Sequence, residues 1–406
     1  MFLTYDVPFP EPPCGRQTMG KQLVLVGAGH AHLTTISAIR SLVKRGHTVT
    51  VIAPSDHHYY SGMAPGMLAG TYRPQEVRFN VHKLATGRGG LFIKGKVTGI
   101  NPDQQEVLLE DGQRVPYDVV SFNVGSVIPS GKMELGNGSI FTVKPIERIM
   151  EGRTAILDLW DRHDSNDPLN LVVAGGGPAG VEMAGALWRL SRDNRIKSRI
   201  TLLTGNELLG LLPRRLQAKV RRSLGKRGIQ IREESRVAST GSHSVVLEDG
   251  SVLPADITLL ATGVIPSRLF TESGLPTGGD GGLLVNNYLQ SVQYPQIFGG
   301  GDCVTLQEGP LARVGVYAVR ENPVLLTNLA AAMEEKPFQR FDPGSPEFLL
   351  ILNMGDGTAV FRKGEWIFKG KPAFWIKDFI DRRFMRKFQL SGELAEPLSG
   401  ELGEEI

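Results

Sequence analysis

QLVLVGAGHAHL, residues 22–33, decides the fold of this chain. The stretch begins as a short apolar run, which is typical of a buried strand, and passes through Gly27 and Gly29 into a helical pattern. Gly27 permits a tight turn, and Gly29, which has no Cβ, lets a pyrophosphate approach main-chain N–H groups at the start of a helix. His32 stands where a third glycine is usual, and a plain strand-to-helix turn is the alternative. The interpretation therefore depends on whether the pattern occurs again.

The pattern does occur again, in LVVAGGGPAGVEMAGAL at residues 171–187. This copy has all three glycines of a dinucleotide-binding turn, which are Gly175, Gly177 and Gly180. A hairpin signal, LEDG followed by Pro and Asp, is also present twice, at residues 109–118 and 247–256, with six positions at one offset (249 − 111 = 138). The sequence therefore predicts an α/β fold with two Rossmann-like dinucleotide-binding domains, a duplicated unit with one copy inserted in the other.

The order of these patterns predicts where the domains begin and end. The first domain is expected in two pieces, because the second is inserted in it. A C-terminal α+β segment with an amphipathic helix follows both. The predicted boundaries are 1–20 for a flexible tail, 21–145 and 275–335 for the first domain, 146–274 for the second, and 336–406 for the C-terminal region with its helix at 372–389.

Composition excludes several classes of protein. The chain has 406 residues, 41% hydrophobic and 21% charged, which is enough for two or three ordinary globular domains. Its net charge of +3 gives no argument for a nucleic-acid partner, and no apolar run is long enough to span a membrane. Two cysteines, Cys14 and Cys303, exclude a disulfide framework and a four-thiolate metal site. We expect a cytoplasmic protein without a bound metal or nucleic acid.

The first unit is predicted as a strand at 22–27, a helix at about 30–45 and a strand at 48–53. HHYYSGMAPGMLAG, residues 57–70, leaves the carboxyl edge of that second strand, where ligands bind in such sheets. Its glycines, single proline, tyrosines and methionines favour a lid over a flat aromatic cofactor. A surface loop packed by its own side chains is the alternative.

A later glycine-rich turn, YPQIFGGGDC at residues 294–303, carries a candidate ligand-binding carboxylate. Asp302 follows the three glycines and is placed to accept a hydrogen bond from a polyol, although capping of the next helix explains it equally well. A helix is predicted at 311–334, and short strands at 347–369.

The predicted helix at 372–389 is amphipathic, with an apolar band of phenylalanine, isoleucine and tryptophan beside a basic margin. This combination suits a helix that lies in the plane of an anionic lipid surface, which would attach the protein to the inner face of the cell membrane. The alternatives are a helix docked on its own core or on a second copy in a homodimer. The acidic tail after Ser391 is expected to be disordered.

These residues resemble the flavoprotein family that contains type II NADH dehydrogenases and sulfide:quinone oxidoreductases, over nearly the whole chain from about residue 21. The GAGHAH turn, the YSGM loop at 60–63, the AVR triplet at 318–320 and DFIDRRFM at 378–385 are most similar to a subgroup found alone or fused in front of selenophosphate synthetase. The resemblance implies FAD on the first glycine turn and NADH or NADPH, as co-substrate, on the second.

The resemblance also implies residues of the active site. Lys144 matches a lysine near the flavin, and Glu182 a glutamate near the nicotinamide, so both are predicted to be catalytic. Tyr317 and Arg320 fall at the family's quinone pocket, although both glutamines of type II dehydrogenases are missing there. The residues predicted to hold FAD are Gly27, Gly29, His30, Ala31, His32, Gly125, Gly301 and Asp302. Those predicted to hold NAD(P)H are Gly175, Gly177, Pro178, Gly180, Thr204 and Gly263.

The choice between NADH and NADPH stays open. The strand at 200–203 ends in Thr204 and Gly205, without the acidic residue that usually binds the adenosine ribose. The missing carboxylate removes a barrier to a 2′-phosphate. Arg214 and Arg215 could assist NADPH, and a solvated basic face is their alternative role.

The electron acceptor follows from the cysteines. Disulfide reductases of this type use a cysteine pair close after the first turn, and none is present, so a thiol relay is disfavoured. That leaves a diffusible acceptor, and a quinone at the membrane fits the basic amphipathic helix at 372–389. We therefore predict a peripheral-membrane oxidoreductase that passes a hydride from NAD(P)H to FAD and then electrons to a quinone. The alternatives are a soluble FAD reductase or oxidase in sulfur or selenium metabolism, and a non-catalytic flavin-binding partner protein.

Overall fold

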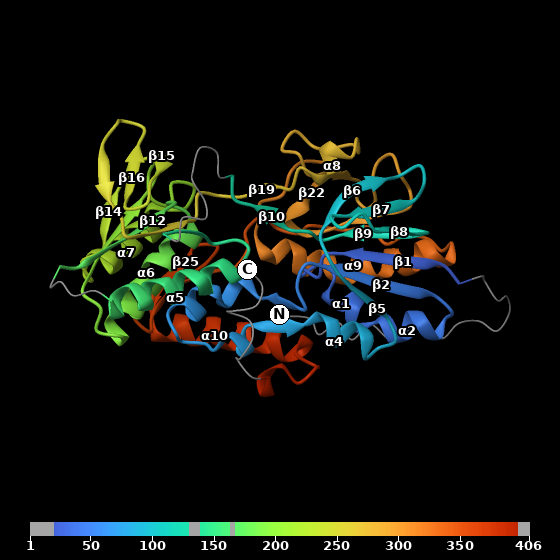
Figure 1. Cartoon of the computed structure of the whole chain (residues 1–406), viewed down its shortest axis with the longest axis horizontal. Helices are drawn as coiled ribbons and strands as arrows, with labels where there is room; N and C mark the ends of the chain where they lie inside the picture. The colour runs from blue at the N-terminus through green and yellow to red at the C-terminus, as the bar shows by residue number, and fades with distance from the viewer. Residues whose placement is uncertain (1–19, 130–138, 163–166, 397–406) are drawn as a thin grey trace.

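The computed structural model describes residues 20–129, 139–162 and 167–396. It has two halves, each built on a five-stranded parallel sheet (Figure 1). The first sheet has the order β21-β9-β1-β2-β5, with β1 (Gln22–Val26), β2 (Thr48–Ala53), β5 (Leu91–Lys94), β9 (Val119–Phe122) and β21 (Ile297–Gly299). The second has the order β11-β18-β12-β13-β14, with β11 (Ile140–Thr142), β12 (Leu169–Ala174), β13 (Ser198–Leu203), β14 (Gln230–Arg232) and β18 (Ile257–Leu260).

The two halves repeat one plan, which confirms the predicted fold class. Each glycine turn follows the central strand of its sheet, β1 or β12. Each half also carries a three-stranded antiparallel sheet, and each LEDG sequence forms a hairpin turn within it. These strands are β6 (Val97–Asn101), β7 (Glu106–Leu109) and β8 (Arg114–Pro116) in the first half, and β15 (Val237–Thr240), β16 (Ser244–Leu247) and β17 (Val252–Pro254) in the second.

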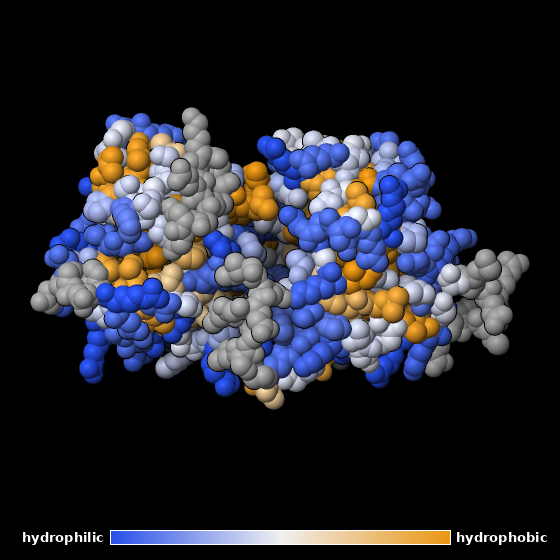
Figure 2. All heavy atoms as spheres, viewed as in Figure 1, coloured by the Kyte–Doolittle hydropathy of each residue, from blue (hydrophilic) through white to orange (hydrophobic). Residues whose placement is uncertain are grey.

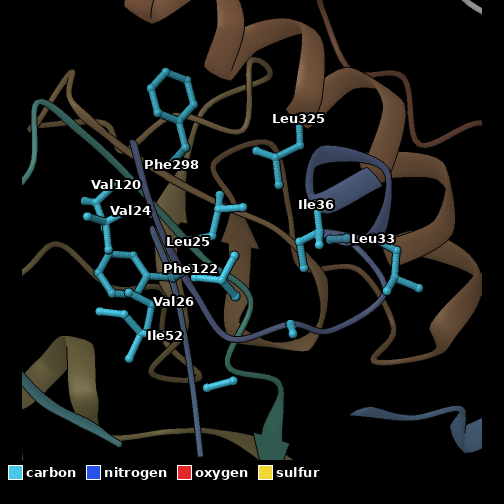
Figure 3. Packing of buried hydrophobic residues seen from close by; sticks show 14 of the residues in the cluster. Val24, Leu25, Val26, Leu33, Ile36, Ile52, Val120, Phe122, Phe298 and Leu325 are labelled. Atoms are coloured by element: carbon cyan, nitrogen blue, oxygen red, sulfur yellow. The ribbon is translucent and has the colours of Figure 1, made fainter. Parts of the chain in front are cut away.

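The core of the first half lies on both faces of β1, as expected for a strand inside a parallel sheet. Figure 3 shows Leu25 pointing toward Ile36 and Leu325, which belong to α1 (Leu33–Ser37) and α9 (Gly315–Glu334). Val24 and Val26 lie on the opposite side of the strand. This apolar run therefore fixes the end of β1, and with it the glycine turn that follows.

The first helix differs from its prediction. The pattern at 30–45 forms two short helices, α1 and α2 (Ile39–Lys44), which meet at Ala38, where φ is −92° and ψ is 1°. In the second half α6 (Pro178–Asp193) begins directly after Gly177, whereas α1 begins three positions later in the repeat. The delay follows from His32, whose side chain occupies the place of the third glycine, as described below.

Segment 57–70 is not a surface loop. It forms β3 (His57–Tyr59), a 3₁₀ turn at Ser61–Met63, and α3 (Ala64–Leu68), which is buried throughout. Its α3 packs against α6 of the second half, so this segment lies between the two glycine turns. The surface in Figure 2 is hollowed between the two halves.

The chain crosses between the halves at positions that differ slightly from the predicted domain boundaries. β11 pairs with β18, so residues 140–142 belong to the second sheet although the prediction placed them in the first domain. Conversely, Leu269 and Phe270 of α8 (Leu269–Glu272) lie in the core of the first half. The two segments in which the chain passes between the halves pair with each other as a short antiparallel ladder, β10 (Ser126–Val127) with β19 (Ile265–Pro266).

The C-terminal region has the predicted α+β character. Strands β23 (Leu350–Asn353), β24 (Ala359–Lys363) and β25 (Trp366–Gly370) form an antiparallel sheet that leads into α10 (Lys371–Phe388). The expectation of disorder after Ser391 is wrong as far as Glu396. The carboxylate of Glu396 accepts hydrogen bonds from Asn80 (2.6 Å), Lys83 (2.8 Å) and Arg78 (3.0 Å), and this holds the segment in place. The predicted N-terminal tail and Cys14 lie outside the described residues.

The remaining helices are α5 (Glu147–Asp161), which begins just after the predicted domain boundary at 145, and α4 (Val81–Thr86) and α7 (Arg214–Gly225). In the described part of the chain no helix is long and apolar enough to cross a membrane.

Candidate functional site

The first glycine turn presents a set of unused backbone donors. Among the described residues, the N–H groups of Ala28, Gly29 and His30 have no hydrogen-bond acceptor. Gly27 adopts a left-handed conformation (φ +84°), which turns the chain sharply after β1. Such unpartnered amides at the carboxyl end of a central strand suit an anionic pyrophosphate.

The buried side chain of His32 connects this turn to strand β9. Its Nδ1 lies 2.6 Å from the carbonyl oxygen of Gly27, and its Nε2 lies 2.8 Å from Oγ of Ser121 on β9. In the second turn a Cβ on Gly180 would lie 1.7 Å from the carbonyl oxygen of Gly175, so the third glycine is required there. In the first turn the equivalent carbonyl, that of Gly27, is hydrogen-bonded to the imidazole of His32. Burial lowers the pKa of His32 to about 4, so the ring is neutral. Its side chain therefore supports the turn from behind, which corrects the expectation that it would bind FAD.

Asn123, which the sequence analysis did not single out, organises the same turn. Its Oδ1 accepts a hydrogen bond from the N–H of Ala31 (3.1 Å), and its Nδ2 donates to the carbonyl of Gly300 (2.6 Å). A Cβ on Gly29 would lie 2.3 Å from Oδ1, so Gly29 is needed for Asn123 as well as for a ligand. Since the Ala31 N–H is already used, we do not assign it to the cofactor. The only hint in the sequence was the position of Asn123 directly after a buried strand.

Lys144 and Asp302, which were predicted from different arguments, meet at the carboxyl edge of the first sheet. The Lys144 ammonium donates to Oδ2 of Asp302 at 2.6 Å, and the hydroxyl of Ser126 donates to the same oxygen at 2.8 Å. The turn that carries Asp302 is held by Glu321 of α9, whose carboxylate accepts from the N–H of Gly301. A Cβ on Gly125 would meet open space, so a ligand can approach the backbone there.

His30 and His58 form a buried imidazole pair beside these groups. Their rings are 5.3 Å apart, and His30 also stacks on Phe384 of α10 at 5.7 Å. Burial, with a smaller contribution from Lys144, lowers the pKa of His30 to about 4, and burial lowers that of His58 to about 3. Neither Nε2 atom has a hydrogen-bond partner in the described part of the protein. Two orphaned ring nitrogens beside unused amides fit a site built for a polar cofactor such as FAD.

The second glycine turn has the geometry of a complete dinucleotide cradle. Helix α6 begins with Pro178, and the N–H groups of Ala179 and Gly180 in its first turn have no acceptor among the described residues. A Cβ on Gly177 or on Gly263 would meet nothing within 4 Å, so both backbones are open to a ligand. Thr204 is buried, and its hydroxyl donates to the carbonyl of Asn206 at 2.7 Å rather than facing outward.

Helix α10 contributes a buried ion pair between the two cradles. The ammonium of Lys377 donates to the carbonyl of Gly62 (2.7 Å) and to Oδ2 of Asp381 (2.8 Å). The hydroxyl of Tyr60 donates to the other carboxylate oxygen of Asp381 at 3.0 Å. We call Tyr60, Lys377 and Asp381, together with Glu182, the junction cluster.

Glu182 joins this cluster from α6 of the second half. Its Oε1 accepts a hydrogen bond from the N–H of Asn353 at 2.8 Å. Burial raises the pKa of Glu182 to about 7, against the opposing effect of Lys377. Burial also opposes the charge of Lys377, but Asp381 and Glu182 outweigh it and raise the pKa of the ammonium. The cluster thus combines a fixed cation with a carboxyl group that can hold or release a proton near neutral pH.

The two residues predicted for a quinone pocket differ in their surroundings. Tyr317 lines a small pocket with Gly301 and Asp302. The guanidinium of Arg320 lies over the ring of Tyr317, 5.5 Å from its centroid, and donates to the carbonyls of Pro343 and Ser345. Arg320 thus tethers the loop before β23, and its contact with a quinone stays a prediction.

A thiol relay has no support in the described residues. Cys303 is completely buried, and its Sγ contacts the carbonyls of Phe122 and Gly300. Burial raises the pKa of its thiol to about 12, so it is not a thiolate at neutral pH. No group of metal-ligating side chains is found in the described ranges.

Comparison with known proteins agrees with this geometry. The sequence pattern of the family described as pyridine nucleotide-disulphide oxidoreductase matches residues 21–324. Ferroptosis suppressor protein 1 from Taeniopygia guttata is 27% identical over 354 residues, covering 83% of this chain and 87% of that protein. Type II NADH:quinone oxidoreductase from Staphylococcus aureus is 24% identical over 392 residues, covering 90% of this chain and 96% of that protein. The solved sulfide:quinone oxidoreductase of Aquifex aeolicus shares the fold, with a TM-score of 0.74 at 17% identity over 91% of this chain and 92% of that one.

Proposed function

This chain belongs to the pyridine nucleotide-disulphide oxidoreductase family, a family of flavoproteins, and on that basis we propose that it is an FAD-dependent NAD(P)H:quinone oxidoreductase. The observation that carries the proposal is the pair of glycine cradles, each with unused amides, on either side of the junction cluster. In this proposal the half that contains residues 21–145 and 275–335 holds FAD, and the half that contains 146–274 holds NAD(P)H.

The residues of the first half fit FAD. The amides of Ala28, Gly29 and His30 would hold its pyrophosphate, and Asp302 would accept a hydrogen bond from its ribityl chain. When bound, FAD would supply the two-electron chemistry. Lys144, paired with Asp302, is positioned to stabilise negative charge at this edge of the sheet.

The junction cluster would handle protons. Reduction of a quinone to a quinol consumes two protons as well as two electrons. With a pKa of about 7, Glu182 can hold a proton at Oε and give it up at neutral pH, which an ordinary carboxyl group cannot do. Lys377 keeps a positive charge beside it, and Tyr60 and Asp381 fix the ammonium in place.

A small diffusible acceptor is favoured over a thiol. Cys303 is inert, and no second cysteine is near it among the described residues. The similar protein from Staphylococcus aureus is named as an NADH:quinone oxidoreductase, which supports a quinone as the acceptor here. Tyr317 borders the pocket next to Asp302, with Arg320 beside it, and both stay candidates for contact with the quinone.

We also propose that α10 holds the protein on an anionic membrane surface. Its inner face is buried through Ala373, Asp381, Met385 and Phe388. Its outer face exposes Trp375 (63%), Ile376 (38%) and Phe379 (59%) beside four exposed cations, which are Lys371, Arg383, Arg386 and Lys387. Exposed tryptophan and phenylalanine among basic side chains are typical of a helix that lies in a lipid interface.

Anaerobic spectroscopy tests the proposed reaction. We expect the purified protein to be yellow, to bleach when NADH or NADPH is added, and to recover its colour when a quinone is supplied. A colourless protein, or one that neither nucleotide bleaches, would contradict the proposal. Recovery with sulfur or selenium compounds and not with quinones would instead favour a reductase of sulfur or selenium metabolism, and bleaching without any effective acceptor would favour a flavin-binding partner protein.

A further inference from the structure

In the described part of the chain, the two residues that follow β13 offer no carboxylate to an adenosine ribose diol. Thr204 has only 3% of its surface exposed, and its hydroxyl is turned to the carbonyl of Asn206. Gly205 follows and has no side chain. In dinucleotide-binding domains that take NADH, a carboxylate usually occupies this place and accepts hydrogen bonds from the ribose.

An arginine lies where that carboxylate is missing. The Nε of Arg236, at the start of β15, lies 3.1 Å from the position that a Cβ on Gly205 would take. The side chain of Arg236 is 59% exposed. Its ion pair with Glu248 spans 3.9 Å between two exposed side chains, and such pairs contribute little stability. The guanidinium is therefore available to an anionic ligand.

Two acidic residues close in sequence to this site, Glu207 and Glu233, are engaged elsewhere. Both carboxylate oxygens of Glu233 accept from Arg221 of α7, at 2.6 and 2.7 Å, and one also accepts from the N–H of Leu208. The carboxylate of Glu207 is 3.8 Å from the same Arg221. Arg221 thus keeps these two carboxylates together on the α7 side, and the side chain that lies against the backbone of Gly205 is that of Arg236.

We infer that the second cradle selects NADPH over NADH and that Arg236 recognises the 2′-phosphate. This inference rests on the proposed function, since it requires a nicotinamide nucleotide in the second half. A guanidinium can donate two parallel hydrogen bonds to phosphate oxygens, whereas the 2′-hydroxyl of NADH finds no acceptor at Thr204 or Gly205. The predicted helpers Arg214 and Arg215 are exposed at the start of α7, and Arg215 lines a separate groove against β25.

The adenosine half of each nucleotide tests the inference without any turnover. Titration calorimetry of the purified protein would compare 2′,5′-ADP, which carries the 2′-phosphate, with 5′-AMP, which lacks it. We expect 2′,5′-ADP to bind more tightly, and Arg236→Gln to weaken it about 10- to 100-fold while 5′-AMP binding is unchanged. Lys226→Gln, which removes a cation from the far end of α7, is the matched control and should alter neither affinity.

A second variant adds what the site lacks. Gly205→Glu places a carboxylate beside Arg236, and it should shift the preference of the protein toward 5′-AMP. Equal binding of both probes, or an equal effect of Arg236→Gln on both, would overturn the inference and leave the proposed function intact if NADH or NADPH still bleaches the flavin. If the protein binds neither 2′,5′-ADP nor 5′-AMP, both the inference about Arg236 and the proposed function are overturned.

Discussion

Three cations on the outer face of α10 should account for most of the electrostatic attraction of the protein to a membrane. The triple variant Arg383→Gln, Arg386→Gln, Lys387→Gln removes three exposed charges, and with them the contact of the Lys387 ammonium with the ring of buried Phe388 at 5.2 Å. A basic residue near an anionic lipid surface contributes about 1 kcal/mol, so the variant should lose about 3 kcal/mol of binding free energy. This loss corresponds to about a 150-fold weaker partition onto vesicles.

The apolar side chains of the same face should also contribute to the free energy of membrane binding. Trp375 and Phe379 are 63% and 59% exposed. Since complete burial of such a side chain contributes about 1.5–3 kcal/mol, insertion of the exposed part should contribute roughly 1–2 kcal/mol each. The double variant Trp375→Ser, Phe379→Ser should therefore weaken binding about 30- to 1,000-fold, with no change in its dependence on salt.

Co-sedimentation with vesicles of phosphatidylglycerol and phosphatidylcholine measures both variants. Higher salt should weaken binding of the unaltered protein strongly and that of the triple charge variant only slightly, because screening acts on the charges that the variant lacks. The charge-matched control is Lys219→Gln, Arg222→Gln, Lys226→Gln on α7. Equal loss of binding in this control would show that any basic surface suffices, and it would refute the assignment to α10. Binding that survives in the α10 variants would leave the helix a packing or dimer element.

Three further outcomes follow from the buried parts of the site. Gly180→Ala should lower the melting temperature and abolish reduction of the flavin by NAD(P)H, because its Cβ would lie 1.7 Å from the carbonyl of Gly175. Gly177→Ala, whose Cβ meets nothing within 4 Å, should weaken binding of the nucleotide without lowering the melting temperature. Equal melting temperatures of the two variants would contradict this prediction. The folded-state pKa of His32 is about 4 and the unfolded value is 6.5, so the stabilising effect of the neutral ring is complete above the unfolded pKa and is lost as the pH falls toward 4. In urea unfolding, His32→Asn should therefore destabilise the protein by about 2 kcal/mol less at about pH 5 than at about pH 8. A destabilisation that does not change with pH would contradict this prediction. Asp381→Asn should cost about 3–5 kcal/mol in the same assay because it removes the carboxylate that is hydrogen-bonded to the buried ammonium of Lys377. The double variant Lys377→Met, Asp381→Leu should recover most of that loss.

Local patterns explain why so much of the fold was predictable. The glycine spacing of each turn belongs to one strand-turn-helix unit and can be read locally, and the contact between Gly180 and the carbonyl of Gly175 lies within such a unit. The repeated hairpin then revealed the duplication, because equivalent positions keep one spacing. The predicted helix at 30–45 failed for a local reason as well, since His32 cannot pack as a glycine does and α1 begins only after it.

The parts of the site that the sequence did not predict come from distant segments. Lys377 contacts Gly62, which is 315 positions away, and Asn123 contacts Gly300 across 177 positions. Arg236 is near Gly205 only because β15 returns beside the end of β13. An acidic or basic residue in an amphipathic helix is usually solvated, so nothing in the pattern of α10 distinguished Lys377 and Asp381, which are buried, from Arg383 and Arg386, which are exposed. Membership of the subgroup fused to selenophosphate synthetase stays a prediction.

The insertion of one half within the other also imposes an order on synthesis. The second sheet uses residues 140–260 only, so all its strands have left the ribosome while the first sheet still lacks an edge. That edge is β21, and with it come Gly300, the partner of Asn123, and Glu321, which holds the turn of Asp302. Domains generally fold as units during translation. The cradle that begins this chain is therefore completed after the second one, and until then the edge of β9, where β21 will pair, stays open to other chains.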